Sequence, residues 1–314
     1  MAKNNSVKKE RKSRIDRLLN FSKNSYFERT SRPLCAAAFL LPFIIFYEIG
    51  TILINTDVLR QSQIRVVAFV WLQDFLEYLG FASKFAWIAP PLAVLIILLS
   101  LQVVSRKPWK VLPKDLWKMA LESIALALPL LLFNMVLVST PRNPQPAPAN
   151  PPSVSSAGHL QSEGWPITCS SQNTNQWNPP GRTSAGYNQP ASRPGLLADI
   201  VTGIGAGIYE ELIFRLILIS LLMIFLYDVC GFPHGNAIII SVILSAALFS
   251  VYHHIDFLTG RQTEPFELMR FLFRTIAGVY FAVLFAVRGF GITAGTHAFY
   301  DIIAVFINAY LGFC

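Results

Sequence analysis

Eight ionisable side chains lie within apolar stretches of the last third of this 314-residue chain. A charged side chain near the centre of a bilayer costs roughly 2.5 to 3.5 kcal/mol on insertion scales, so a cluster of them needs mutual pairing or a water-filled cavity. Carboxylates and imidazoles can transfer protons near neutral pH, and they also bind divalent metals. The cluster therefore predicts a site of proton-transfer or metal chemistry. Its members are Glu210, Glu211, Arg215, His253, His254, Asp256, His297 and Asp301.

Two neighbouring carboxylates begin the cluster, in the pattern Glu-Glu-x-x-x-Arg. Glu211 and Arg215 are four residues apart, so on a helix they share one face and can form an ion pair. Glu210 is rotated by about 100 degrees around the helix axis from Glu211, so it does not face Arg215. The spacing predicts one carboxylate held by Arg215, its structural partner, and a second carboxylate available as a base.

Two further patterns follow at the same helical spacing. Phe249 and His253 place an aromatic ring and an imidazole on one helix face. His297 and Asp301 can place an imidazole and a carboxylate side by side. This arrangement either fixes the tautomer of a histidine or builds a metal site.

Membrane helices must carry these residues. With 53% hydrophobic residues, 14% charged residues and a mean hydropathy of +0.47, the chain is too apolar for an ordinary soluble domain, which has about 25% charged residues. The composition predicts an all-α, polytopic transmembrane helical bundle. Seven apolar windows are each close to the roughly 20 residues that a spanning helix requires. They cover residues 34–54, 86–104, 119–139, 197–227, 237–257, 268–288 and 290–312.

An eighth span is an alternative for residues 64–82, whose apolar and polar residues otherwise fit an amphipathic helix lying in the membrane interface. An eighth span would place the segment 106–118, with five Lys or Arg and one Asp, on the outer side. Basic segments favour the cytoplasmic side of a membrane. Seven spans with a cytoplasmic N-terminus therefore fit the charges better.

Composition divides the chain into four parts. Residues 1–33 are a basic tail with ten Lys or Arg against three Asp or Glu, and we expect this tail to face the cytoplasm and anionic lipid rather than nucleic acid. Residues 34–139 form N-terminal transmembrane helices. Residues 140–196 contain eleven of the 20 prolines and predict a disordered external loop. Residues 197–314 form a C-terminal transmembrane core that carries the whole cluster.

Glycines flank the cluster. Three of them lie within residues 203–207, just before Glu210, and predict that a neighbouring helix approaches closely there. The predicted topology places Glu210 and His253 farther than His297 from the cytoplasmic ends of their helices. We therefore expect the glycine-rich segment 289–295 to be irregular backbone that dips into the protein and lets the three residues meet.

In this order on late membrane helices, EExxxR, FxxxH and HxxxD resemble the signature of the CPBP family, also called Abi. This family comprises CAAX proteases and bacteriocin-processing enzymes and includes the Ras-converting CAAX endopeptidase. The resemblance, over residues 197–312, implies a membrane-embedded metalloendopeptidase acting on a membrane-associated or prenylated-type protein. It implies that Glu210 is the catalytic glutamate, in one motif with Glu211, and that His253 is its partner in activating water. His297 and Asp301 would complete the catalytic site.

Two roles remain open for the third motif. In one, Glu210, His253, His297 and Asp301 hold a divalent metal, with zinc as the expected ion, which activates water and polarises the scissile carbonyl. In the other, Glu210 and His253 share the proton of the water while His297 donates to the oxyanion. The family often has Asn at the position of Asp301. The added negative charge favours a metal, whereas a neutral Asn would favour direct oxyanion stabilisation.

Other function classes also remain open. The buried polar cluster could be an ion relay in a polytopic transporter or a structural network in a non-catalytic membrane scaffold. Few polar residues occur in the first three predicted spans, which favours one buried site over a path across the membrane. His254 and Asp256 lie off the face of the second motif, and we expect them at a cavity rim or a helix cap. The expected partners are a membrane protein or peptide substrate and the lipid bilayer, and no nucleic acid.

Overall fold

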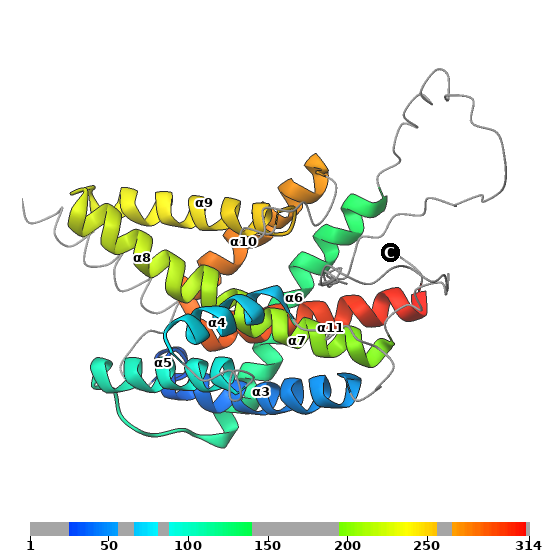
Figure 1. Ribbon diagram of the computed structural model, residues 1–314, viewed down its shortest axis with the longest axis horizontal. Helices are drawn as coiled ribbons and strands as arrows, with labels where there is room; N and C mark the ends of the chain where they lie inside the picture. The colour runs from blue at the N-terminus through cyan, green and yellow to red at the C-terminus, as the bar shows by residue number, and fades with distance from the viewer. Residues whose placement is uncertain (1–24, 56–65, 81–87, 140–194, 256–265, 312–314) are drawn as a thin grey trace, which may run out of the picture.

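The computed structural model describes residues 25–55, 66–80, 88–139, 195–255 and 266–311, and every regular element in these ranges is a helix (Figure 1). The predicted all-α, polytopic bundle is confirmed. The helices, in chain order, are α2 (Tyr26–Thr30), α3 (Pro33–Asn55), α4 (Val67–Tyr78), α5 (Ala89–Ser105), α6 (Pro113–Ser139), α7 (Leu196–Glu211), η2 (Leu212–Leu218), α8 (Ile219–Met223), η3 (Ile224–Val229), α9 (His234–Tyr252), α10 (Leu268–Arg288) and α11 (Phe290–Leu311).

Among the described residues, six helical segments are long and apolar enough to cross a membrane, compared with the seven spans predicted. The remaining window corresponds to α5, which has 17 residues and a length of about 25 Å. α4 matches the predicted amphipathic segment, and its 12 residues, about 18 Å, are too short for the eighth span. Residues 140–194 of the predicted loop 140–196, most of the predicted tail and Asp256 lie outside the described residues.

One continuous helical segment carries the first motif. α7, η2, α8 and η3 follow one another without a gap over 34 residues, from Leu196 to Val229. η2 and η3 are π-helical, with backbone hydrogen bonds to the carbonyl five residues earlier, and η2 begins directly after Glu211. α9 packs beside this segment (Figure 1). Its Ser245 hydroxyl donates to the Phe214 carbonyl at 2.7 Å, so the neighbouring helix helps to satisfy the wider turn.

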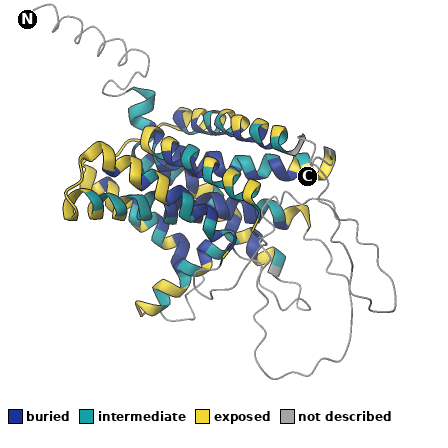
Figure 2. Cartoon of the chain, turned by 90° about the horizontal axis from the view of Figure 1, so that it is seen from above, coloured by how far each residue is buried: buried dark blue, intermediate teal, exposed yellow. Residues whose placement is uncertain are grey.

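α11 forms the centre of the bundle. Residues 290–298 are all buried, and α11 packs against α3, α6, α7 and α10; Figure 2 shows the buried residues gathered in the middle of the molecule. A Cβ atom added to Gly207 would lie 2.5 Å from the backbone nitrogen of Ala298, and one added to Gly203 would lie 2.6 Å from Cβ of Asp301. The predicted close approach is confirmed: α7 and α11 touch where only glycine fits.

The glycine-rich segment 289–295 is not irregular, so that prediction is wrong. Only Gly289 leaves the helical conformation, with φ of +77°, and α11 is helical from Phe290 onward. The later glycines instead allow close packing, since a Cβ on Gly291 would lie 2.8 Å from Cα of Ala36. The helices that carry the first and third motifs meet because α7 and α11 cross directly. The predicted depths of Glu210 and His297 in the membrane did not indicate this crossing.

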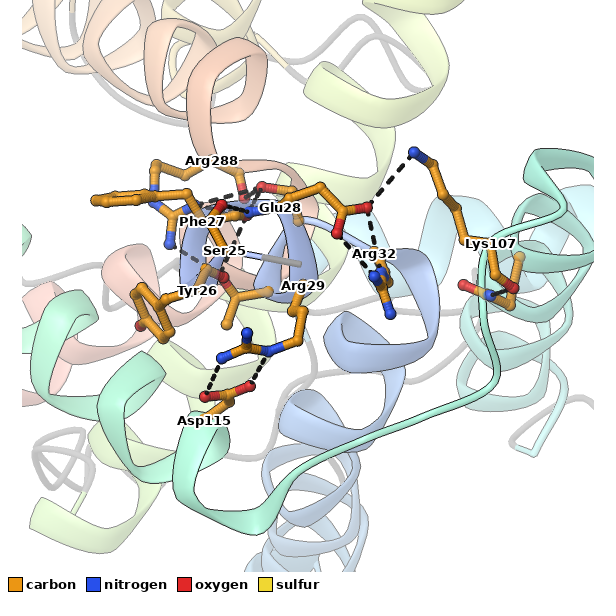
Figure 3. A network of polar contacts seen from close by, with 12 residues as sticks. Ser25, Tyr26, Phe27, Glu28, Arg29, Arg32, Lys107, Asp115 and Arg288 are labelled. Carbon is orange, nitrogen blue, oxygen red and sulfur yellow. Dashed lines mark hydrogen bonds and ion pairs between the residues drawn. The ribbon is translucent and has the colours of Figure 1, made fainter. Parts of the chain in front are cut away.

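A polar network fixes the turn between α10 and α11 (Figure 3). Arg288, the last residue of α10, donates to both carboxylate oxygens of Glu122 on α6, at 2.5 and 2.8 Å, and to the Thr30 hydroxyl at 2.9 Å. Arg29 pairs with Asp115 at the start of α6 at 2.8 Å. The last residues of the predicted basic tail thus form a docked helix, α2, rather than free chain.

Candidate active site

The first and third motifs meet where α7 crosses α11. Nδ1 of His297 lies 2.7 Å from Oε1 of Glu211, and both side chains are buried. Because an ionised carboxylate only accepts hydrogen bonds, Nδ1 carries the hydrogen. The spacing within the first motif predicted Arg215 as the partner of Glu211 and gave no indication of this second bond.

Arg215 forms the ion pair that the spacing predicts. Its Nε lies 3.1 Å from Oε2 of Glu211, and both side chains are fully buried. The guanidinium also lies 4.2 Å from the ring centre of Phe249 and 5.6 Å from that of Phe281. These aromatic faces favour a desolvated cation. Glu211 therefore bridges Arg215 on one side and His297 on the other.

Asp301 lies beside His297, as the four-residue spacing predicts. Its Oδ2 is 3.6 Å from Nε2 of His297, just beyond hydrogen-bond distance. The ring of Phe281 on α10 stacks on the imidazole, with ring centres 4.6 Å apart and an angle of 16° between the planes. The orientation of His297 is therefore set from three sides: by Glu211, by Phe281 and by Asp301 on its own helix.

His253 joins this group through an aromatic ring. It caps the C-terminus of α9, and its Nδ1 lies 2.9 Å from the carbonyl oxygen of Phe249. The Phe249 ring centre lies 4.8 Å from that of His253 and 6.2 Å from that of His297. The second motif thus places Phe249 between the two imidazoles, with Arg215 over the same ring.

Glu210 is 1% exposed and lies close enough to His297 and Asp301 for their charges to act on it. The Tyr252 hydroxyl donates to Oε1 of Glu210 over 3.5 Å. Sequence reasoning missed Tyr252, although a hydroxyl directly before His253 at the end of an apolar helix was a visible signal. The carboxylate expected to be available as a base is therefore a hydrogen-bond acceptor.

His254 is separate from this group. It is 3% exposed, and its ring centre lies 5.3 Å from that of Phe266 and 6.3 Å from that of Phe271. It is therefore packed among aromatic rings toward α10, and its position directly after the C-cap of α9, with its backbone N–H donating to the Val251 carbonyl at 2.9 Å, fits the helix-cap alternative rather than the cavity rim.

The donor atoms do not form the predicted metal set. No group of three or more His, Cys, Asp or Glu side chains within the described ranges is arranged to hold a metal ion. Nδ1 of His297 binds Glu211 and Nδ1 of His253 faces a backbone carbonyl, whereas Nε2 of His297 lies 3.6 Å from Oδ2 of Asp301, beyond hydrogen-bond distance. The described side chains therefore show no preformed set of three metal ligands. The metal requirement stays a prediction.

Comparison with known families adds an independent observation. Residues 192–303 match the family described as type II CAAX prenyl endopeptidase, Rce1-like. This region of the chain belongs to the CAAX protease family. The match contains all three motifs and confirms the resemblance. The CAAX protease region begins just before α7, so α2 to α6 lie outside it. No curated protein and no solved structure matches the chain.

Proposed function

We propose that this chain is an intramembrane endopeptidase that cleaves a peptide bond in a membrane-associated protein substrate of the prenylated type. The observation that carries the proposal is the buried contact between Glu211 and His297, which joins two CAAX protease motifs across two helices. Glu211 is itself paired with Arg215, and His297 has Asp301 beside it on its own helix. Such supporting contacts hold a catalytic imidazole in one orientation.

In the proposed reaction, Glu210 accepts a proton from water, and the water oxygen attacks the scissile carbonyl carbon. His253 shares this proton and returns it to the amine nitrogen as the carbon–nitrogen bond breaks. A doubly protonated His297 donates through Nδ1 to Glu211 and through Nε2 to the carbonyl oxygen as that oxygen becomes negative. Two observations support this role: Glu211 engages only Nδ1, and Nε2 is 3.6 Å from Asp301.

Arg215 and Asp301 take supporting roles in this proposal. Arg215 orients Glu211, and Glu211 in turn orients His297. Asp301 balances the positive charge of His297 without occupying the hydrogen-bond position that the oxyanion needs.

The test is cleavage of a farnesylated C-terminal peptide by the full chain, purified in detergent or nanodiscs. Wild type should release the C-terminal fragment, and Glu210→Ala should lower the rate by at least a thousandfold with no loss of yield. Glu267→Ala is the matched control, because its ion pair with Arg270 lies at the start of α10. Equal rates for wild type and Glu210→Ala would contradict the proposal. Ion flux through the wild-type protein without any cleavage would favour the transporter alternative, and neither activity would favour the scaffold.

A further inference from the structure

We propose that the Tyr252 hydroxyl positions the Glu210 carboxylate for water activation, and that Trp71 of α4 holds Tyr252 in place. The inference rests on the proposed function, in which Glu210 is the base. It adds a positioning residue from each of two elements, and one of these elements lies outside the CAAX protease match.

Tyr252 is the last residue of α9 and is 3% exposed. Its hydroxyl reaches Oε1 of Glu210 across the interface between α9 and α7, over 3.5 Å. Hydrogen bonds at catalytic groups are often long before substrate binds and shorten in the reacting complex. A donor on Oε1 restrains the rotation of the carboxylate that accepts the proton from water in the proposed reaction.

Trp71 packs against the Tyr252 ring. Their ring centres lie 4.9 Å apart at 76°, an edge-to-face arrangement that favours this orientation of the two rings. Val67, one turn earlier on α4, packs with Trp71 against Phe214, Phe249 and Tyr252. Tyr252 therefore has little freedom to rotate away from Glu210.

α4 is suited to this role because its two faces differ. Ala68, Phe69 and Leu72 are buried against the bundle, whereas Asp74 and Phe75 are exposed. Figure 1 shows α4 lying across the helical segment that carries the first motif, and α4 contacts α7. The short helix, supplied by the N-terminal part of the chain, thus supports Tyr252 through Trp71.

The first test is Tyr252→Phe, which keeps the ring and its packing but removes the hydroxyl. We expect kcat to fall roughly tenfold, equivalent to about 1.4 kcal/mol of activation free energy, with KM and melting temperature unchanged. Tyr209→Phe is the matched control: Tyr209 is equally buried and next in sequence to Glu210, but its hydroxyl faces Glu48 at 3.4 Å. Its kcat should equal that of wild type.

The second test asks whether Trp71 acts through Tyr252. Trp71→Ala should lower kcat in the wild-type background and have no further effect in the Tyr252→Phe background, whereas Trp71→Phe should restore most of the rate. Effects that multiply in the double variant, or an unchanged kcat for Tyr252→Phe, would overturn the inference while leaving the proposed function intact. Absence of cleavage by wild type would overturn the proposed function and this inference with it.

Discussion

Oε1 of Glu211 and Nδ1 of His297 lie 2.7 Å apart, although 86 positions separate the two residues in the chain. This bond links α7 to α11 and leaves Oε2 of the same carboxylate for Arg215. One side chain therefore serves two cationic or donor partners in a fully buried setting. Its neighbour Glu210 faces a different helix and a different partner, Tyr252.

The two adjacent glutamates should respond differently to substitution. Glu211→Ala leaves Arg215 and His297 without their shared carboxylate, and breaking a buried pair in this way costs about 3 to 5 kcal/mol. We expect low yield and a lower melting temperature for Glu211→Ala. Glu210→Ala should keep the wild-type melting temperature and lose activity. Thermal unfolding in detergent measures both, and equal destabilisation would show that the two carboxylates share one role.

The crossing of α7 and α11 should not tolerate a methyl group. Gly207→Ala places Cβ 2.5 Å from the Ala298 backbone, so the helices must separate, at a cost of about 1 to 3 kcal/mol or more. Separation also lengthens the bond between Glu211 and His297, so cleavage should fall together with stability. Gly235→Ala on α9 is the control, because its Cβ would meet nothing within 4 Å. That change should be neutral or slightly stabilising, by up to about 1 kcal/mol.

Arg288 should be needed for stability rather than for chemistry. Arg288→Met removes hydrogen bonds to Glu122 and Thr30, each worth about 1.5 to 3 kcal/mol where a charged group is involved. We expect a lower melting temperature with KM unchanged in the protein that remains folded. Arg270→Met removes the partly exposed pair with Glu267 and should change stability by less than about 0.5 kcal/mol. Similar losses for the two variants would contradict the importance of the network.

Stability should fall in acid through Glu28 on α2. The hydrogen bond from Arg32 lowers the pKa of Glu28 in the folded chain, and the nearby Lys107 acts in the same direction. A lowered folded pKa means that this contribution is complete above the unfolded value, about 4.3, and is lost as pH falls through the folded pKa. Glu28→Gln should therefore lower the melting temperature at pH 7 but not at pH 2 to 3. An equal effect at both pH values would exclude this linkage.

Removal of metal separates the two proposed chemistries. The contacts of His297 favour the route without a metal, so activity should persist in a sample that elemental analysis shows to be free of zinc and similar ions. In the sequence analysis, the negative charge of Asp301 favoured a metal-dependent enzyme. Loss of cleavage with a chelator, restored by zinc and weakened as pH falls, would support a metal site and contradict the proposed role of His297.

The contacts within each helix were predictable, and the contacts between helices were not. Glu211 with Arg215, and His297 with Asp301, follow from a four-residue spacing that any helix imposes. The bond between Glu211 and His297 depends on how two helices cross, and the glycines indicated close approach without giving the register. The sequence shows the hydroxyl of Tyr252 beside His253, but its contact with Glu210 depends on how α9 packs against α7, which no local pattern reveals.

The N-terminal part shows the same limit. Its basic composition predicted a tail, yet five residues of it form α2, because Arg29 pairs with Asp115 on α6 and Arg288 of α10 donates to Thr30. A count of charges does not distinguish basic residues that set the orientation in the membrane from basic residues that form ion pairs with the helical bundle. The cytoplasmic location of the N-terminus and the external loop stay predictions.

At the α-helical rise of about 1.5 Å per residue the uninterrupted segment from Leu196 to Val229 would be about 51 Å long, and even with the tighter rise of its π-helical turns it exceeds the hydrocarbon core of a bilayer, which is roughly 30 Å thick. An excess of this size is a hydrophobic mismatch, which a helix relieves by tilting, by bending or by thickening the lipid around it. Glu211 and Arg215 lie near the middle of this segment, at the junction of α7 and the π-helical η2. The inclination of the first motif is therefore coupled to membrane thickness, and a bilayer of longer or shorter acyl chains acts directly on the helix that carries it.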